Sequence, residues 1–273
     1  ALERLLQLND TEAVLYFDPD IVVLGSLDEL LGHFAEASVL LTPHQTVPEK
    51  DIEAIMDNEM ASLKYGVFNL GFLGVKSDTL GQDFAAWWSD RLRHFCRDDR
   101  PAGLFTDQKW VNLAPCFFEG VCVLRSPAYN VATWNITTRH VSGDFSSGFF
   151  VNEVPLVFYH FSGFDSGDQA LMLGKYGSEN QSLADLRRWY LAACDEQGQA
   201  ALGQRPGVYS FFDDGTAITD GQRRLYRERI DLQRAFPDPF VTSVSGGYHA
   251  WYSANAATNA AGSASGDGAG ERS

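Results

Sequence analysis

The hydrophobic positions of the chain follow two spacings. Short apolar runs bounded by Gly, Pro, Asn or Asp predict strands, whereas apolar residues that recur every three or four positions predict helices. We predict strands at residues 14–17, 38–42, 66–75, 121–124 and 155–161, a hairpin at 143–148, and helices at 1–8, 27–34, 79–95, 107–113, 181–202 and 220–236. Residues 49–64 predict a surface helix or a flap over an active site. Strands and helices in this alternation predict an α/β fold.

The strand at 14–17 ends at two carboxylates, Asp18 and Asp20, which are separated by Pro19. The run before them is apolar on both faces, which predicts a buried parallel strand at the centre of a sheet. Ligands bind at the carboxyl ends of such strands, and Pro19 stiffens the turn. Carboxylate oxygens in this position suit Mg²⁺ or Mn²⁺ shared with a diphosphate. Asp-Pro-Asp is also a common sequence in turns, so the rest of the sequence has to distinguish a metal site from a simple turn.

Two further strands carry polar side chains where a ligand could reach them. Asn69 and Gly71 lie in the strand at 66–75, and glycines inside a strand indicate close approach of a ligand or another backbone. Asn69 could bind sugar hydroxyls, or it could mark a β-bulge. His160 lies near the carboxyl end of the strand at 155–161 and precedes Gly163. It could complete a metal site, or it could be a hydrogen-bonded core histidine.

Two other segments supply candidates for contact with substrate. The loop at 127–135 combines aromatic rings with amides, a mixture that is typical of a carbohydrate acceptor pocket. Its candidates are Tyr129, Asn130, Trp134 and Asn135. Farther upstream, we predict that Thr106 caps a helix that begins with Asp107 and Gln108. These two residues are either an ordinary helix start or groups that lie over an active-site cleft.

Charge and cysteine usage exclude some classes of function. The net charge of −15 opposes binding to nucleic acid or to an anionic membrane surface. No apolar run approaches the ~20 residues that a membrane span needs, so we expect no integral membrane segment. The four cysteines show no Cys-x-x-Cys spacing, which favours a reduced, cytoplasmic compartment.

Four motifs occur in the order seen in retaining GT-A glycosyltransferases. They are FDPDIVV (17–23), VFNLGFLGV (67–75), TDQKWVNL (106–113) and YHFSGF (159–164). They most resemble family 8, the group of glycogenin and the bacterial lipopolysaccharide transferases, and residues 1 to about 251 are similar to a bacterial branch of such enzymes. The matching positions are Asp18-x-Asp20, Asn69-x-Gly71, Asp107-Gln108 with Asn112, and His160-x-x-Gly163.

This resemblance implies a GT-A fold, a Rossmann-like mixed sheet flanked by helices. It implies metal-dependent transfer of a sugar from a nucleotide-diphosphate sugar, most often a UDP-sugar, to a glycan or other saccharide acceptor. The roles carried over are Mn²⁺ or Mg²⁺ ligands for Asp18, Asp20 and His160, donor and diphosphate contacts for Asn69, Gly71 and Gly163, and catalysis for Asp107 and Gln108. With retention, Gln108 or Asp107 would steady the cationic sugar centre, whereas an inverting enzyme would use Asp107 as base.

Two departures from the family pattern affect these expectations. The family's Lys-Pro-Trp is replaced by Phe164-Asp165-Ser166, and Lys175 is the candidate substitute for its lysine. The βα units that bind the nucleotide in the family precede the Asp18 strand, and the chain would lack on the order of 60–90 residues of them. We therefore expect a truncated GT-A domain over 1–252, with a helical and hairpin extension from about 181, and a disordered tail or linker over 253–273.

Two alternatives remain open from the sequence. The strand followed by Asp18-Pro19-Asp20 also resembles the motif of haloacid-dehalogenase-type phosphatases, in which Asp18 would be the covalent nucleophile. Asp213 and Asp214 would then be the late acidic pair, although Asp-Gly after apolar residues predicts a hairpin turn. The other alternative is an inactive fragment, because a truncated sheet exposes an edge.

Overall fold

The computed structural model describes residues 1–243 and 246–255. It has helices and strands in alternation, so the predicted α/β class is confirmed. The chain forms two compact units, Ala1–Gln197 and Gly198–Ser273. The helix that begins at residue 181, where we expected an extension to start, belongs to the first unit. Of the predicted tail, residues 253–254 end a helix and 256–273 lie outside the described residues.

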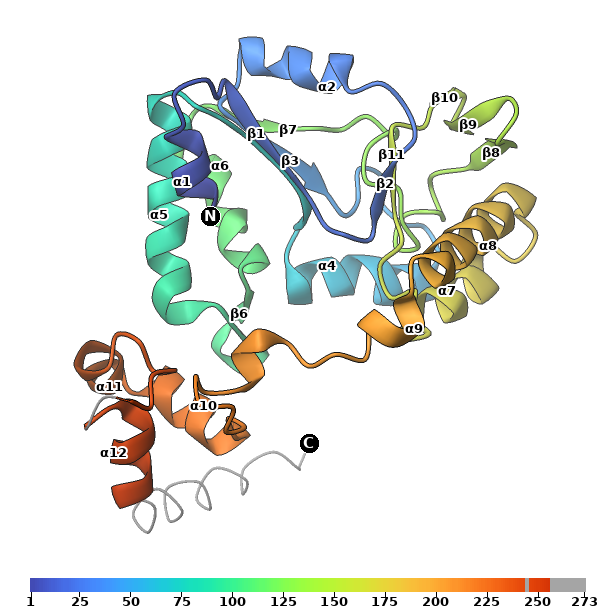
Figure 1. Ribbon diagram of the computed structural model, residues 1–273. Helices are drawn as coiled ribbons and strands as arrows, with labels where there is room; N and C mark the ends of the chain where they lie inside the picture. The colour runs from blue at the N-terminus through green and yellow to red at the C-terminus, as the bar shows by residue number, and fades with distance from the viewer. Residues whose placement is uncertain (244–245, 256–273) are drawn as a thin grey trace. The chain divides into compact units, whose positions relative to one another are not determined.

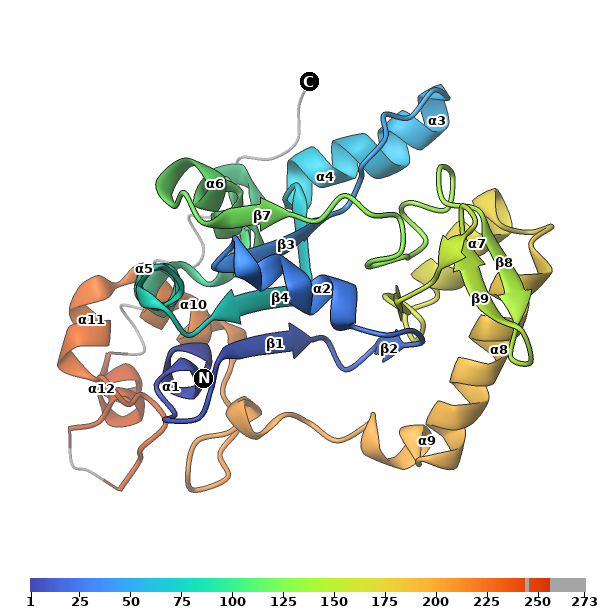
Figure 2. The ribbon, with the colours of Figure 1, turned by 90° about the horizontal axis from the view of Figure 1, so that it is seen from above.

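The first unit is built on a four-stranded mixed sheet with the order β1-β4-β3-β7. Its strands are β1 (Ala13–Phe17), β3 (Val39–Pro43), β4 (Phe68–Lys76) and β7 (Val121–Val123). β4 is antiparallel to β1 and β3, whereas β3 and β7 are parallel. Figure 2 shows the four strands side by side in this order. β3 and almost all of β4 are buried, so they form the centre.

The prediction for the strand before Asp18 is wrong in direction and in position. β1 pairs antiparallel with β4 and lies at an edge of this sheet. Its residues are only partly buried, and the Tyr16 side chain is 47% exposed. An apolar run fixes the strand itself, but it does not say which strand pairs with it or in which direction.

Alternating side chains of the central strands pack against two layers of helices. Leu40 and Phe72 pack with residues of α2 (Asp28–Gly32), whereas Leu41 and Leu73 face Leu6 of α1 (Leu2–Leu6) and the helix α5 (Thr79–Phe95). In Figure 1, α2 lies on one side of the sheet, and α1, α5 and α6 (Ala114–Phe117) lie on the other. The centre of the unit is therefore a three-layer arrangement.

The helix α5 (Thr79–Phe95) has the predicted bounds. Its N-cap is Asp78, whose Oδ1 accepts a hydrogen bond from Gly81 N at 2.9 Å and whose Oδ2 accepts one from Ser38 Oγ at 2.8 Å. We expect Asp78→Ala to lower the free energy of unfolding by about 1 kcal/mol, because it leaves backbone donors of the first turn unpaired. Urea denaturation measures this loss. Asp83→Ala, at an exposed position of the same helix, is the control and should change the free energy by less than about 0.5 kcal/mol.

Smaller elements connect these layers. They are η1 (His33–Ala35), α3 (Ile52–Ala54), the π-helix η2 (Ile55–Glu59), α4 (Met60–Tyr65), β5 (Arg97–Asp99), η3 (Arg100–Ala102), β6 (Leu104–Thr106), η4 (Gln108–Leu113) and α6 (Ala114–Phe117). The helical interpretation of 49–64 is confirmed. The capping role of Thr106 is wrong, because Thr106 ends β6 with a φ of 44° and η4 is a 3₁₀ helix.

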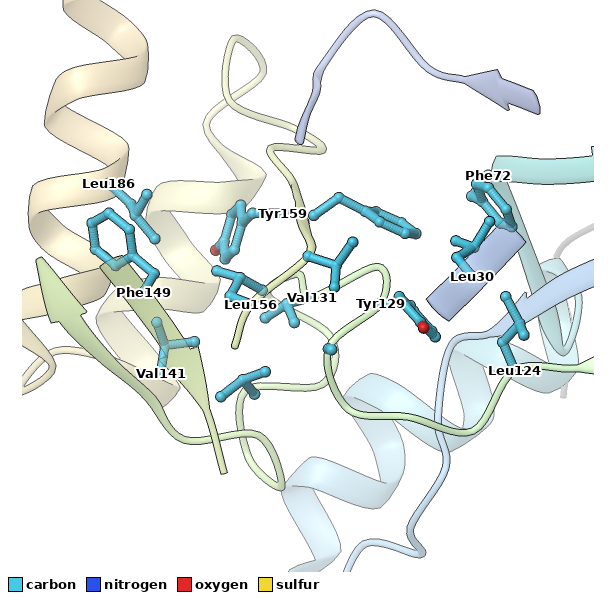
Figure 3. Packing of buried hydrophobic residues seen from close by; sticks show 14 of the residues in the cluster. Leu30, Phe72, Leu124, Tyr129, Val131, Val141, Phe149, Leu156, Tyr159 and Leu186 are labelled. Atoms are coloured by element: carbon cyan, nitrogen blue, oxygen red, sulfur yellow. The ribbon is translucent and has the colours of Figure 1, made fainter. Parts of the chain in front are cut away.

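A second group of strands joins the sheet through a shared core. It comprises β2 (Ile21–Val23), β8 (Val141–Asp144), β9 (Gly148–Val151), β10 (Val154–Pro155) and β11 (Phe158–His160). β2 pairs with β11, and β8 and β9 form the predicted hairpin. Two helices follow, α7 (Asp168–Tyr176) and α8 (Gln181–Glu196). Figure 3 shows the core that runs from Leu186 and Phe149 to Leu30 and Phe72.

The second unit is small and mainly helical over its described residues. Its elements are α9 (Gln199–Leu202), η5 (Val208–Ser210), α10 (Asp220–Glu228), α11 (Ile230–Ala235) and α12 (Tyr248–Ala254), and its core centres on Phe212, Leu232 and Tyr248. Both long helices predicted at 181–202 and 220–236 are interrupted, the first near Gly198, which has a φ of 86°, and the second at Arg229. None of the helices within 1–243 and 246–255 is long and apolar enough to cross a bilayer.

Candidate metal centre

Asp18, Asp20 and His160 come from distant parts of the chain and meet at one point. Asp18 and Asp20 follow β1 in a turn that Asp18 N anchors to Gly71 O of β4 at 2.8 Å. β11 runs antiparallel to β2, with His160 opposite Ile21, so the imidazole reaches the two carboxylates. His160 Nε2 lies 3.1 Å from Asp20 Oδ1 and 3.9 Å from Asp18 Oδ2. One ligand atom of each residue lies within 4.8 Å of the others.

The chemistry of this cluster fits a divalent cation. Two carboxylates and one imidazole nitrogen converge, and His160 is only 3% exposed. Two carboxylate oxygens held within 4.8 Å of each other repel unless a positive charge lies between them. An oxygen, oxygen and nitrogen ligand set suits Mn²⁺ and also accommodates Mg²⁺ or Zn²⁺. The three residues that the sequence predicts as ligands are therefore brought together in a suitable arrangement.

The two carboxyl groups of the cluster differ in their surroundings. Burial raises the pKa of Asp18, against a hydrogen bond from Tyr16 OH to Asp18 Oδ1 at 2.5 Å that lowers it. Burial also acts to raise the pKa of Asp20, but its hydrogen bond and charge interaction with His160 prevail and lower it. Asp20 is therefore the more strongly paired carboxylate in the absence of a cation.

Gly71 makes room for the imidazole. A Cβ at this position would lie 2.4 Å from His160 Cε1 and 2.7 Å from His160 Nδ1, and 2.8 Å from Asn69 Oδ1. Any side chain larger than hydrogen would therefore displace the ring. The sequence predicted close approach of a ligand or another backbone at this glycine, and the group that approaches is instead the side chain of His160. A direct contact between Gly71 and a diphosphate stays a prediction.

Asn69 is not free to bind a donor sugar in this structure. Its side-chain oxygen accepts from Gly71 N at 3.0 Å and from Asn130 Nδ2 at 2.9 Å. Its Nδ2 lies 3.3 Å from His44 Nε2. The residue is 8% exposed, so its amide already has protein partners on both sides. The predicted sugar contact is replaced here by a structural role behind His160.

The two candidate catalytic residues lie in different surroundings. Gln108 uses its whole amide internally, because Oε1 accepts from Leu70 N at 3.1 Å and Nε2 donates to Tyr65 O at 3.2 Å. Its predicted position over a cleft therefore does not fit. Asp107 is close enough to the centre that its charge raises the pKa values of Tyr16 and Asp18. Only Asp107 of this pair remains a candidate for contact with substrate.

Most of the residues predicted to bind an acceptor are buried. Tyr129 is 2% exposed and stacks on Phe158, with ring centroids 5.9 Å apart, as a core residue. Asn130 and Asn135 are fully buried, and Asn135 braces its own loop by accepting from Ala132 N and donating to Asn130 O. Direct contact with an acceptor does not fit these three residues. Trp134 is only partly buried, and its ring centroid lies 5.2 Å from that of His160. It therefore remains a candidate for contact with an acceptor.

Gly163 and Lys175 occupy the segment after His160. Gly163 has a φ of 72°, a conformation that glycine adopts freely, and its carbonyl oxygen accepts from Gln169 N at 3.1 Å. Gly163 therefore shapes the turn into α7. Its contact with a diphosphate stays a prediction. Lys175 is paired with Asp57 at 2.7 Å and Glu53 at 3.2 Å. The lysine that we considered for the diphosphate thus holds α7 to the helix at 52–65.

His44, which follows β3 in a loop, is a further member of this region. Its ring contacts the side chain of Asn69 and packs against the ring of Trp134, with the two ring centroids 5.2 Å apart. Asn69 Nδ2 can only donate, so His44 Nε2 accepts and carries no proton. Removal of the imidazole from water lowers the pKa of His44 from 6.5 to about 4. The signal in the sequence was weak, because a histidine after a strand is common.

The low pKa of His44 predicts loss of stability in mild acid. The unfolded chain takes up a proton near pH 6.5, whereas the folded state resists it until about pH 4. The contribution of His44 is thus fully present above pH 6.5 and is lost as the pH falls toward 4. Urea denaturation at pH 7 and pH 5 should show this fall, and it should be smaller in His44→Gln. Equal falls in both proteins would contradict the assignment.

Comparison with known proteins assigns no activity to the chain. No protein-family model matches it. It is similar to two proteins of Bacillus subtilis (strain 168). The uncharacterized protein YfnF is 30% identical over 165 residues, which are 60% of this chain and 54% of YfnF. The uncharacterized protein YfnD is 30% identical over 158 residues, 57% of this chain and 48% of YfnD. The chain thus spans about half the length of these relatives.

Proposed function

We propose that the first unit belongs to a metal-dependent glycosyltransferase of the GT-A type, related to family 8. The observation that carries the proposal is the convergence of Asp18, Asp20 and His160. They are the residues of the first and last motifs of the resemblance, and they come from segments that lie far apart in the sequence. The four-stranded mixed sheet between two helical layers is compatible with a GT-A arrangement.

The proposed substrate is a nucleotide-diphosphate sugar, with UDP as the first candidate nucleotide, and a saccharide acceptor. Asp18, Asp20 and His160 would hold Mn²⁺ or Mg²⁺, which neutralises the diphosphate that leaves when the bond to the sugar breaks. Asp107 is the carboxylate that we propose acts on the sugar. It would either stabilise positive charge at the anomeric carbon or take the proton from the attacking hydroxyl group of the acceptor. The ring of Trp134 could cover an apolar face of a sugar.

The phosphatase alternative is less well supported. It would require Asp213 and Asp214 as an acidic pair beside the nucleophile. Asp213 Oδ1 instead accepts from Thr242 N at 2.9 Å, and Asp214 Oδ1 accepts from Thr216 N at 2.8 Å. Asp214 thus closes the predicted turn, in which Phe212 N donates to Thr216 O, whereas Asp213 ties this turn to Thr242. Both carboxylates therefore have structural hydrogen bonds within the second unit.

Calorimetry with UDP and GDP tests the proposal. We expect one of the nucleotides to bind in the presence of Mn²⁺, and to lose this binding in EDTA. Asp213→Ala, a carboxylate outside the centre, should bind as the wild type does. Metal-dependent hydrolysis of a generic phosphate ester that Asp213→Ala abolishes, without nucleotide binding, would contradict the transferase and favour the phosphatase.

A further inference from the structure

The side of His160 that faces away from the carboxylates is held by a chain of amides. His160 Nδ1 lies 3.1 Å from Asn130 Oδ1. Asn130 Nδ2 lies 2.9 Å from Asn69 Oδ1 and 2.9 Å from Thr42 Oγ1. Asn69 Oδ1 also lies 3.0 Å from Gly71 N. All of these residues are buried, so each group must find its partner within the protein.

One backbone group determines which atom donates and which accepts in each of these hydrogen bonds. Gly71 N–H can only donate, so the atom of Asn69 that faces it must be the amide oxygen. Because that oxygen accepts, Asn130 must present its NH₂ group to Asn69 and its oxygen to His160. An amide oxygen cannot donate, so His160 carries a proton on Nδ1. The backbone of β4 thereby sets the tautomer of a side chain on β11.

The hydroxyl of Thr42 agrees with this polarity. Thr42 Oγ1 donates to Asn69 O at 3.3 Å, which leaves its lone pairs to accept from Asn130 Nδ2. Asn130 is therefore held by two acceptors on one side and one donor on the other. Rotation of its amide would place NH₂ against the proton of His160 and oxygen against two oxygens. One orientation is thus strongly favoured.

Fixing this tautomer matters because the neighbouring carboxylate favours the other one. Asp20 Oδ1 lies 3.1 Å from His160 Nε2, a distance at which a neutral imidazole would gain a hydrogen bond by carrying its proton on Nε2. A proton there would occupy the position of a metal ion. The hydrogen bond to Asn130 keeps a proton on Nδ1, so Nε2 is the nitrogen that can bind a metal ion.

We propose that Asn130 is the positioning residue of the metal centre, and that the chain Gly71 N–Asn69–Asn130 holds His160 in its metal-binding tautomer. The proposal rests on the metal site of the proposed function. It assigns no contact with substrate to Asn130. It also explains why Asn69 and Asn130 are buried amides, a type of residue that is normally exposed.

The test compares Mn²⁺ affinity in the wild type and in Asn130→Gly. Asn130 has a φ of 54°, so glycine removes the amide without backbone strain. We expect affinity to fall 10- to 100-fold, the usual cost of losing an outer partner of a metal-binding histidine. Thr42→Val is the matched control. It removes one hydrogen-bond partner of Asn130 but leaves the hydrogen bonds from Gly71 N through Asn69 and Asn130 to His160 in place, so it should change the Mn²⁺ affinity less than about threefold.

A second measurement reads the tautomer directly, whether or not Asn130→Gly folds well. In protein loaded with Zn²⁺, a diamagnetic ion that binds imidazole, nitrogen-15 NMR should show His160 with a slowly exchanging proton on Nδ1. His160→Gln identifies the signal. A proton on Nε2 with metal on Nδ1, or equal Mn²⁺ affinity of wild type and Asn130→Gly, would overturn this proposal alone. A wild type that binds neither ion would overturn the proposed function as well.

Discussion

Gly71→Ala should weaken Mn²⁺ binding by about 100-fold or more, at least the upper end of what loss of an outer partner costs. The added methyl group would lie 2.4 Å from His160 Cε1, so the ring has to move. It cannot easily retreat, because Trp134 and Asn130 lie on its other sides. The same crowding should lower the free energy of unfolding by about 1–3 kcal/mol. Calorimetry and urea denaturation measure the two effects.

Gly74→Ala is the matched control on the same strand. A Cβ there would meet Phe34, Leu15 and Leu40 at 3.1–3.2 Å, all apolar side chains away from the centre. This variant should lose stability but keep its affinity for Mn²⁺. If both variants lost affinity equally, the effect would reflect general loosening of β4 rather than displacement of His160.

Asp20→Ala should abolish the stabilisation of the protein by Mn²⁺. A ligand that binds only the folded state at 100 times its dissociation constant adds about 2.7 kcal/mol to the free energy of unfolding. We therefore expect Mn²⁺ to raise the melting temperature of the wild type and to leave that of Asp20→Ala unchanged. The variant removes the carboxylate nearest to His160 Nε2.

Asp28→Ala serves as the control for Asp20→Ala. Asp28 is an exposed carboxylate that accepts a hydrogen bond from Ser26 Oγ at 2.7 Å. Its loss should leave the Mn²⁺-induced shift intact. A shift that persists in Asp20→Ala would place the tight metal site elsewhere on this acidic chain, whose net charge is −15.

The sequence predicts the members of the metal centre better than it predicts their surroundings. Asp18 and Asp20 could be named because they follow an apolar run, and His160 because it lies near the end of another; the four motifs then implied that all three are metal ligands, and the structure brings them together. The position of β1 could not be predicted, because an apolar run does not reveal its partner strand. Pairing of β1 with β4 places it at an edge, where Tyr16 is exposed.

The amides of the region show where local patterns fail. Asn69 was predicted to bind the donor sugar because glycines lie in the same strand, and Asn130 to bind the acceptor because it lies in a loop with aromatic rings. Their actual partners are each other, across 61 positions of sequence, and backbone or imidazole groups. Local sequence cannot distinguish an amide that awaits a ligand from one that is satisfied by a distant strand. Gln108, bonded to Leu70 N of β4, is a third example.

The most direct test of the account is pulsed electron paramagnetic resonance of Mn²⁺ bound to the wild type. We predict one tightly bound ion per chain, with magnetic coupling to a single imidazole nitrogen that disappears in His160→Gln. This outcome would establish His160 as a ligand of the ion and so place the ion beside Asp18 and Asp20. Bound Mn²⁺ without nitrogen coupling, or coupling that survives in His160→Gln, would contradict the account.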